Sequence, residues 1–248
     1  MLGYPDRAAA RVREADALAG TIEHPFTTAH AYRFAAGFHL SRRESGAVRE
    51  CADASVAVAT EHGFGAVLKA ATFLQGWALA EHGGGQEGMA RMRDALAACR
   101  DIRAGLLLPA YLAWLAEVEG EIGRPDEGPA LVSEGLANSR RSGCHYWTAE
   151  LHRLEGTLAL ESVGAEAAES SLHEALTIAR RQRAKSLELR AAMSLGRLWR
   201  KQRRGSEAHA LLLEAYQWFT EGFETPDLRE AKALLEQHGP RTSGKLAP

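Results

Sequence analysis

The chain has ten histidines and 32 aspartates and glutamates, the side chains that most often transfer protons or bind metal ions in enzymes. Their spacing fits no such site, because neither HExxH nor GxSxG occurs in the sequence. Adjacent pairs such as His173 and Glu174 are typical of exposed helix surfaces. We therefore expect a protein that is not an enzyme and that needs no metal or other cofactor.

A glycine-rich stretch, Gly83 to Gly88 (GGGQEG), matches the GxGxxG pattern of dinucleotide-binding loops. Such a loop must follow a β-strand and open a helix within a βαβ unit. Here the residues up to His82 have the periodicity of a helix. We therefore interpret the stretch as a turn between two helices.

The three cysteines, Cys51, Cys99 and Cys144, are far apart and form no CxxC or Cys/His cluster, which predicts reduced thiols. The net charge of −2 gives no general attraction to nucleic acid or anionic lipid. No apolar run approaches the roughly 20 residues that cross a bilayer, and the N-terminal residues lack the apolar core of a signal peptide. We expect a cytoplasmic protein that does not enter a membrane.

One segment is strongly basic. Between positions 180 and 204 a single acidic residue, Glu188, is outnumbered by ten basic ones: Arg180, Arg181, Arg183, Lys185, Arg190, Arg197, Arg200, Lys201, Arg203 and Arg204. Such a segment could bind the phosphates of nucleic acid or of a phosphorylated partner. However, few aromatic residues are interleaved, and the basic residues stand mostly at helix C-termini and turns, where they complement helix dipoles. Nucleic-acid binding is therefore the less favoured interpretation.

The clearest structural pattern runs from Ala184 to Tyr216, where two amphipathic helices are joined by a short basic turn. Their apolar stripes consist of Leu187, Ala191, Leu195 and Leu198 in the first helix, and Ala208, Leu211, Leu212 and Ala215 in the second. Gly196, Ala208 and Ala215 are small enough for two helix backbones to approach closely. We expect these positions to be contacts between helices.

Small residues recur throughout the chain at steps of 39 to 41 residues. One column holds Gly37, Gly76, Ala116, Gly156 and Gly196; a second holds Ala15, Ala54, Ala95, Gly135, Ala175 and Ala215; a third holds Gly88, Gly128, Ala168 and Ala208. Every residue of the second column directly follows an aspartate or glutamate. Three columns in phase indicate an internal repeat of helical hairpins.

This pattern resembles the tetratricopeptide repeat, a helical hairpin whose small residues stand at the same offsets of 12 and 7 as Gly156, Ala168 and Ala175. The period here is longer than the roughly 34 residues of that repeat, because extra residues fall between one hairpin and the next. The resemblance implies an all-α fold, a right-handed α-α superhelix of hairpins that each span about 40 residues.

We predict one repeat domain over residues 1–238. It comprises a half-repeat at 4–20, hairpins at about 27–61, 65–100, 107–140, 146–182 and 186–221, and a capping helix at 227–237. Residues 239–248 are predicted to form a disordered tail. The half-repeat would leave an apolar face around Val12 and Ala15 partly uncovered, and self-association could occur through it.

In tetratricopeptide arrays the first helix of each hairpin lines a concave groove, through residues six before, three before and one after the small position. Transferred to this sequence, the rule gives Phe34, Phe38, Phe73, Trp77, Glu117, Glu150, Arg153, Arg190, Met193 and Arg197. This predicted groove runs from aromatic through acidic to basic, which suits an extended peptide or a helix with an apolar anchor and a charged flank. Alternatively, Phe34, Phe73 and Trp77 are core residues between hairpins.

The C-terminal quarter has a more specific resemblance. Lys185 to Ala192, Leu195 to Trp199, Trp218 to Phe223 and Asp227 to Leu235 resemble the end of a bacterial family of large signalling proteins. Members of that family join a class III adenylate or guanylate cyclase, or a winged-helix domain, to a nucleotide-binding ATPase and then to a tetratricopeptide array. The chain has no GxxxxGK[ST] loop, so the resemblance covers the repeat region alone and implies the C-terminal part of a longer ancestral protein.

Three functions remain open. The favoured one is a scaffold in bacterial signal transduction that binds a protein or peptide partner in its groove. The second is a regulatory or sensory part of a cyclase, an ATPase or a transcriptional regulator, with the upstream ATPase or cyclase domain as its partner. The third is a helical repeat that binds RNA or DNA.

Overall fold

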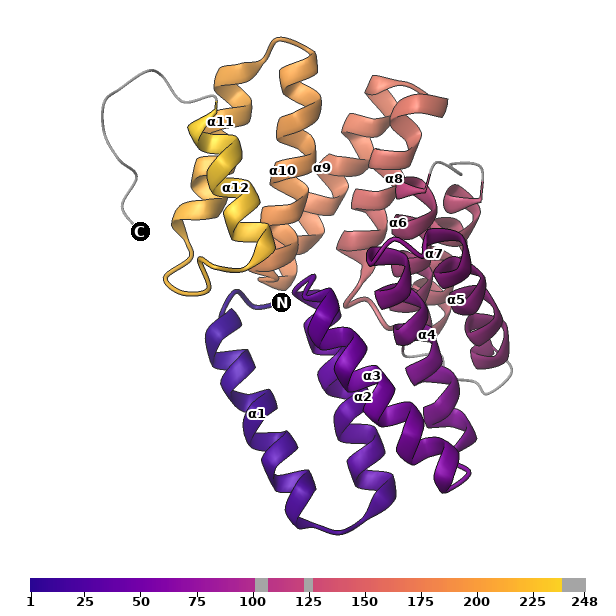
Figure 1. Cartoon of the computed structure of the whole chain (residues 1–248). Helices are drawn as coiled ribbons and strands as arrows, with labels where there is room; N and C mark the ends of the chain where they lie inside the picture. Colours follow the sequence, from indigo (N-terminus) through magenta and orange to yellow (C-terminus); the bar gives the residue numbers. More distant parts are fainter. Residues whose placement is uncertain (101–106, 123–126, 238–248) are drawn as a thin grey trace. The chain divides into compact units, whose positions relative to one another are not determined.

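The computed structural model describes residues 1–100, 107–122 and 127–237, and every regular element in these ranges is an α-helix (Figure 1). The helices are α1 (Pro5–Thr21), α2 (Pro25–Ser41), α3 (Ser45–Glu61), α4 (Gly65–Glu81), α5 (Gly85–Arg100), α6 (Leu108–Glu121), α7 (Gly128–Ser142), α8 (Thr148–Ser162), α9 (Ala165–Gln182), α10 (Lys185–Lys201), α11 (Gly205–Gln217) and α12 (Pro226–Glu236). The tail predicted at 239–248 lies outside the described residues.

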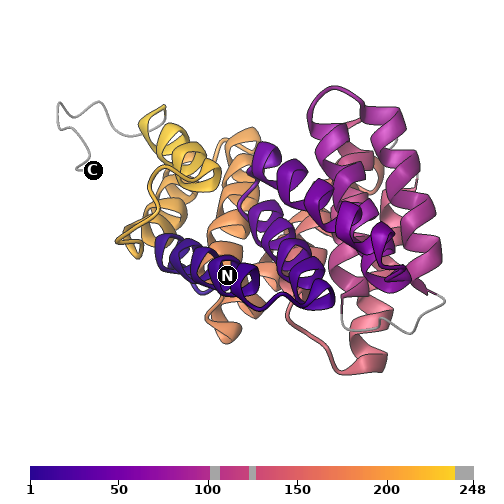
Figure 2. The ribbon, with the colours of Figure 1, turned by 60° about the horizontal axis from the view of Figure 1, so that its bottom comes forward.

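The chain forms two compact units. Unit 1 consists of Met1–Asp6 with Thr148–Pro248, and unit 2 consists of Arg7–Trp147. In unit 2 each helix from α2 to α7 packs on the next one, and α4 also contacts α2 and α6 (Figures 1 and 2). In unit 1 the helices from α8 to α12 follow the same scheme, with α10 contacting α8 and α12. In each unit, therefore, the first helices of successive hairpins form one layer, as in a helical repeat. The expectation of one domain over 1–238 stays a prediction.

Helix α10 shows why this sequence folds into packed helices. The stripe predicted for α10 and α11 is buried at Leu187, Ala191, Leu195, Leu198, Ala208, Leu212 and Ala215, and Leu211 is partly buried. Leu195 and Leu198 join Leu172 of α9 in one apolar cluster. Because α10 has neighbours on several sides, burial of these apolar side chains removes them from water around most of the helix and stabilises the fold.

The columns of small residues mark where the two helices of a hairpin touch. A Cβ on Gly156 would lie 2.8 Å from the carbonyl oxygen of Ala168, and a Cβ on Gly196 would lie 3.7 Å from that of Ala208. The predicted close approach is therefore present at Gly196 and Ala208. Gly37 differs, because a Cβ there would meet nothing within 4 Å. Residues of the same column can therefore differ in how closely the neighbouring helix approaches them.

Two of the acidic residues next to the second column, Glu134 and Glu214, make contacts between hairpins. Glu134 of α7 accepts hydrogen bonds from Arg100 of α5 at 2.5 and 2.9 Å. Glu214 of α11 accepts one from Arg180 of α9 at 3.0 Å. The two arginines are 80 residues apart, as are the two glutamates, so the same ion pair recurs two repeats later. At these two positions the acidic column thus has a structural role that the sequence did not reveal.

The glycine-rich stretch is a turn between helices, as predicted. Gly83 adopts a left-handed conformation with φ 92°, the stretch follows helix α4, and α5 begins at Gly85. Gly63, with φ 70°, occupies the equivalent turn before α4. A non-glycine residue is strained in this region of φ, which explains the His-Gly sequences at both helix ends.

The last hairpin departs from the prediction, because α11 ends at Gln217 and not near 221. The residues after it bind the first residues of the chain. Gly222, with φ 77°, donates its N–H to the Asp6 carboxylate at 2.8 Å, and Asp6 donates its own N–H to Glu221 at 3.1 Å. Tyr4 lies 5.3 Å from Trp218 between ring centroids. We call this set of contacts the clasp of unit 1.

On helix α1 the two residues predicted to lie on an uncovered apolar face, Val12 and Ala15, are at least partly exposed. Ala15 is exposed and Val12 is half-buried, whereas Ala19 is buried. Asp16 lies close enough to His39 of α2 and to Cys51 of α3 for their charges to interact. Self-association through Val12 and Ala15 stays a prediction.

Candidate functional site

The most exposed aromatic surface of unit 2 lies on α2. Phe26, His30 and Phe34 stand at intervals of four residues on one face of this helix, with ring centroids 4.5 and 6.0 Å apart. Phe64, just before α4, continues the stack, with its centroid 5.2 Å from that of Phe26. Phe26 is 46% exposed and Phe34 is 60% exposed. We call Phe26, His30, Phe34 and Phe64 the aromatic row.

A buried cation lies beside the aromatic row. Arg33 is only 7% exposed, and its guanidinium carbon lies 3.8 Å from the centroid of the Phe34 ring. No carboxylate within the described ranges forms an ion pair with it. A buried guanidinium without a counter-charge is rare, because losing its hydration costs several kcal/mol. Arg33 was not among the residues predicted for the groove.

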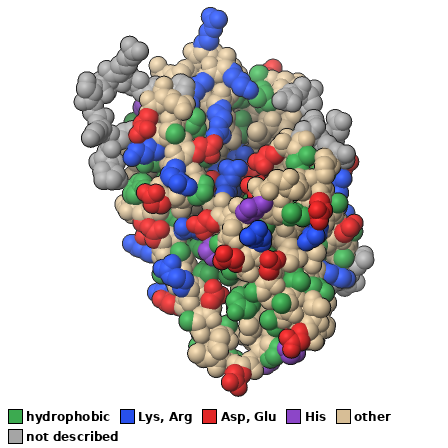
Figure 3. Space-filling view, in the orientation of Figure 1, with side chains coloured by type: hydrophobic (Ala, Val, Ile, Leu, Met, Phe, Trp, Pro, Cys, Tyr) green, Lys and Arg blue, Asp and Glu red, His purple; other side chains and the backbone are tan. Residues whose placement is uncertain are grey.

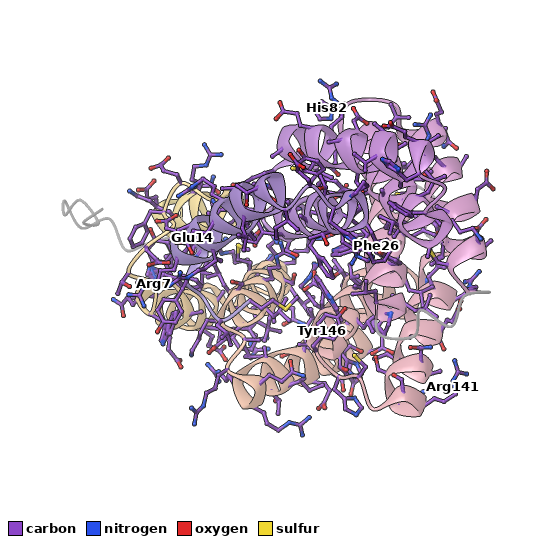
Figure 4. The ribbon with its side chains drawn as sticks, turned by 90° about the horizontal axis from the view of Figure 1, so that it is seen from below. Arg7, Glu14, Phe26, His82, Arg141 and Tyr146 are labelled. Atoms are coloured by element: carbon purple, nitrogen blue, oxygen red, sulfur yellow. The ribbon has the colours of Figure 1, made fainter. Side chains whose placement is uncertain are left out.

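Three aromatic side chains of unit 2 carry buried polar atoms that make no hydrogen bond of standard geometry in the described part of the chain. They are the Tyr111 hydroxyl and Trp114 Nε1 of α6, and the hydroxyl of Tyr146, which precedes α8. Tyr111 and Trp114 have ring centroids 5.8 Å apart, and Trp147 lies 5.2 Å from Trp114 and 6.0 Å from Tyr146. Figure 4 labels Tyr146, and also Phe26 of the aromatic row.

The charges around these groups are positive. Burial raises the pKa of Tyr111, and the nearby Arg33 guanidinium opposes that rise. Burial also raises the pKa of Cys99, against the charges of Lys69 and Arg33. Lys69 of α4 is half-buried and forms no ion pair with a described residue. We call Arg33, Tyr111, Trp114 and Tyr146 the donor cluster, because its polar atoms can all donate hydrogen bonds.

In unit 1 the helices α8, α10 and α12 carry a buried ion network. Glu150 of α8 accepts hydrogen bonds from Arg153 at 2.8 Å and from Arg190 of α10 at 3.4 Å. Arg190 also donates to Asp227 of α12 at 2.7 Å. All four side chains are buried. The network therefore ties the first-helix layer of unit 1 together, and Asp227 is the member that sequence reasoning missed.

The ten residues of the predicted groove have different environments. Phe73, Trp77, Glu150, Arg153, Arg190 and Met193 are buried, Phe38 and Glu117 are half-buried, and Phe34 and Arg197 are exposed. Phe73 packs in the interior at 4.6 Å from Tyr111, so it fits the alternative interpretation as a core residue. Arg197 pairs with Glu230. The accessible aromatic residues of the predicted groove, Phe34 and Phe38, are thus on α2. The charged groove residues of unit 1 contact other side chains of the same unit.

Half of the ten basic residues in the basic segment pair with carboxylates of unit 1, and among the others Arg181, Arg183, Lys201 and Arg203 are exposed without an ion pair to a described residue. Arg180 and Lys185 both bind Glu188, and Arg204 binds Glu169 at 2.7 Å and Glu207 at 2.8 Å. Arg200 donates to the carbonyl oxygen of Leu234. On the face shown in Figure 3 acidic and basic side chains are interspersed. The ion pairs reduce the positive charge that this segment could offer to nucleic acid.

The described residues also bear on metal binding and on membrane insertion. They contain no group of three or more His, Cys, Asp or Glu side chains placed to hold a metal ion. None of their helices combines the length and the apolar character needed to cross a membrane. Cys51, Cys99 and Cys144 are free thiols.

Comparison with known sequences gives one relative. No family model matches the chain. Among curated proteins, an uncharacterized protein of Rhizobium meliloti (strain 1021) is 29% identical over 178 residues, which make up 71% of this chain and 17% of that protein. The chain thus spans less than a fifth of the length of this relative.

Comparison with solved structures settles the fold. The chain is similar to a Rap protein complexed with competence and sporulation factor, with a TM-score of 0.62 and 10% identity over 87% of this chain and 65% of that one. It is also similar to the apo form of RapI (TM-score 0.58, 10% identity, 94% and 91% covered) and to BtubC from P. vanneervenii (TM-score 0.58, 14% identity, 98% and 96% covered). The fold is a tetratricopeptide-like helical repeat. The predicted all-α superhelical class is confirmed.

Proposed function

We propose that this protein is a non-catalytic scaffold that binds a protein or peptide partner in bacterial signal transduction, and that unit 2 carries the binding surface. The aromatic row is the observation that carries this proposal. Exposed apolar side chains are ordinary when they stand alone. Four neighbouring rings, three on one face of α2 and one just before α4, with two of them about half exposed, are typical of a surface that another molecule covers.

Charged residues of the predicted groove in unit 1 already contact one another, which favours unit 2 as the binding surface. Glu150, Arg153 and Arg190 contact one another in the buried network, and a partner that used them would have to break those ion pairs. Phe34 and Phe38 of the predicted groove are available without such a change. The partner's apolar anchor is therefore assigned to α2, and a helix or extended segment with two or three large apolar side chains would fit it.

Two similarities support the class of function. A Rap protein of similar fold has been solved in complex with competence and sporulation factor, so this helical architecture can hold a regulatory factor. The relative from Rhizobium meliloti is a bacterial protein, in line with a bacterial setting.

A displayed peptide library tests the proposal. Peptides would be selected on the wild-type protein, and their affinities would be measured by fluorescence anisotropy for the wild type and for a Phe26→Ser, Phe34→Ser double variant. We expect binding to weaken at least about tenfold in the double variant. Val163→Ser is the matched control, because Val163 is an exposed apolar residue of unit 1. Peptides that bind the double variant as well as the wild type would refute the site.

A second candidate is a regulatory C-terminal part of a larger nucleotide cyclase, ATPase or transcriptional regulator. It is favoured by the length of the relative, in which the matched region is only 17% of the protein. The DNA upstream of the codon for Met1 tests this candidate. An in-frame phosphate-loop ATPase would support it, and a stop codon without such a sequence would count against it.

A further inference from the structure

The donor cluster of unit 2 combines two features that are unfavourable in a free protein. Arg33 is a buried cation that no described carboxylate neutralises, and the Tyr111 O–H and the Trp114 indole N–H, in side chains 3% and 7% exposed, have no hydrogen-bond acceptor in the described part of the chain, although the Tyr111 hydroxyl lies within reach of the Arg33 guanidinium. Each unsatisfied buried group costs about 1–3 kcal/mol, and a buried charge costs more. A ligand that accepts hydrogen bonds and carries a negative charge would remove these costs.

The groups lie on two helices that pack on the same third helix. Arg33 stands on α2 and Tyr111 on α6, and both helices contact α4. Arg33 is close enough to Tyr111 for its charge to act on the hydroxyl. Phe73 of α4 packs on the Tyr111 ring at 4.6 Å and on Trp114 at 6.4 Å. Packing of this kind holds the donors in fixed positions.

We propose that the donor cluster binds a carboxylate group, carried by the same peptide partner whose apolar side chains contact the aromatic row. This inference rests on the proposed function, because the row supplies the remaining contacts. Arg33 would pair with the carboxylate, and the Tyr111 hydroxyl and Trp114 Nε1–H would donate to its oxygens. Three donors of this kind satisfy a carboxylate, which only accepts hydrogen bonds.

The number of charges favours a carboxylate over a phosphate. Arg33 is the buried cation of the cluster, and it balances the single negative charge of a carboxylate. A phosphate monoester carries close to two negative charges at neutral pH, and the second would rest on Lys69, which is only half-buried. The aromatic walls of Phe73 and Trp147 would not compensate an extra negative charge, because ring faces are themselves negative.

The position of Arg33 beside the exposed Phe34 ring would allow a ligand to reach its guanidinium from solvent. Its guanidinium lies over the Phe34 ring at 3.8 Å. The N–H groups of a guanidinium lie in its own plane, and those that do not face the ring can donate to a carboxylate. Because Phe34 is exposed, a peptide lying along the aromatic row would reach the edge of Arg33 from solvent.

A titration with small probes tests this inference. The probes are N-acetyl-leucyl-phenylalanine, its C-terminal amide, N-acetyl-aspartyl-phenylalaninamide and inorganic phosphate, and the readout is the Trp114 indole N–H resonance, assigned with a Trp114→Phe variant. We expect the free acid to bind at least about tenfold more tightly than the amide. Comparison with the aspartyl probe shows whether the carboxylate comes from a chain end or from a side chain.

Three variants of the whole chain locate the interaction. Arg33→Gln should abolish the difference between acid and amide, whereas Arg49→Gln, which removes the same charge from an exposed position of α3, should preserve it. Tyr111→Phe should weaken binding of the acid and change the midpoint of thermal unfolding little, because its O–H has no acceptor in the described part of the chain and only the contact with Arg33 is lost. That combination separates a ligand-binding hydroxyl from a structural one.

Several results would overturn the inference. Equal binding of acid and amide by the wild type, tighter binding of phosphate than of the acid, or no response to any probe would each do so. None of these results tests the aromatic row. The role of the row is tested separately, by the affinity of the selected peptides for the Phe26→Ser, Phe34→Ser variant.

Discussion

Gly76 of α4 and Gly88 of α5 face each other so closely that a Cβ added to Gly76 would lie 2.8 Å from the carbonyl oxygen of Gly88. The reverse substitution is no easier, since a Cβ on Gly88 would lie 2.5 Å from the carbonyl oxygen of Gly76. Backbone atoms cannot turn aside as a flexible side chain can. The two helices therefore touch at a point where both need glycine.

The first prediction follows from this contact. Gly76→Ala should lower the free energy of unfolding by about 2 kcal/mol, because the added methyl group overpacks the interface. Gly37→Ala is the control, since a Cβ there would meet nothing within 4 Å and alanine favours the helix by up to about 1 kcal/mol. Urea unfolding of both variants checks the prediction. Similar effects at the two positions would contradict it.

The second prediction concerns the ion network of unit 1. Asp227→Asn should destabilise the protein by about 3 kcal/mol, because it leaves the buried Arg190 without one of its carboxylate partners. Glu230→Gln on the same helix removes a partner of the exposed Arg197 and should cost less than about 1 kcal/mol. Thermal and urea unfolding give both values. Equal losses would show that burial does not set the strength of these pairs.

The third prediction is a pH dependence that comes from Glu169 of α9. Burial by itself would raise the pKa of Glu169, but hydrogen bonds from Trp199, Arg204 and Gln202 lower it to about 2, from 4.5 in a solvated side chain. Because the folded pKa is the lower one, the stabilisation is complete above pH 4.5 and disappears as the pH falls toward 2.

The Glu169→Gln variant measures that dependence. Its deficit in unfolding free energy relative to the wild type should be constant from about pH 5 to pH 7 and should shrink below pH 4.5. Glu166→Gln, at an exposed position of the same helix, serves as the control. A deficit for Glu169→Gln that stays the same down to about pH 2.5 would show that the carboxylate charge is not its source.

The fourth prediction tests whether a substitution at Gly222 opens the clasp through steric collision with Pro5 or through backbone strain. Gly222 and Gly63 have similar left-handed conformations, with φ of 77° and 70°. A Cβ on Gly222 would collide with the Pro5 ring, whereas one on Gly63 would meet nothing within 4 Å. Gly222→Ala should therefore expose the amide of Ser186, which donates to the Met1 carbonyl oxygen at 3.0 Å, to hydrogen exchange. Gly63→Ala should leave that amide protected; if both variants release it, the collision is not the cause.

The helical repeat was predictable because its signal is periodic. Small residues at Gly76, Gly156 and Gly196 repeat every 40 residues, and three of the columns they belong to are in phase. The rule that found the columns does not distinguish Gly76, where the helices touch, from Gly37, where a Cβ would meet nothing. That difference depends on the distance between two helices, which no residue type encodes.

The donor cluster could not be found in the same way. Arginine is usually exposed, so nothing in the sequence around Arg33 indicates that it is buried. The transferred groove rule selects Phe34 and Phe73 but passes over Tyr111 and Trp114, which stand at other positions of their helix. A signal was nevertheless present, because Tyr111, Trp114, Tyr146 and Trp147 are four of the ten tyrosines and tryptophans of the chain.

The clasp of unit 1 also determines the order in which this unit can be completed. Asp6 binds Glu221 and Gly222, which are 215 and 216 residues further along the chain. The ribosome releases the N-terminal residues first, and domains begin to fold as they emerge. Residues 1–6 must therefore wait without their final contacts until residues 221 and 222 have been synthesised, so the closing of unit 1 is a late step in the folding of these residues.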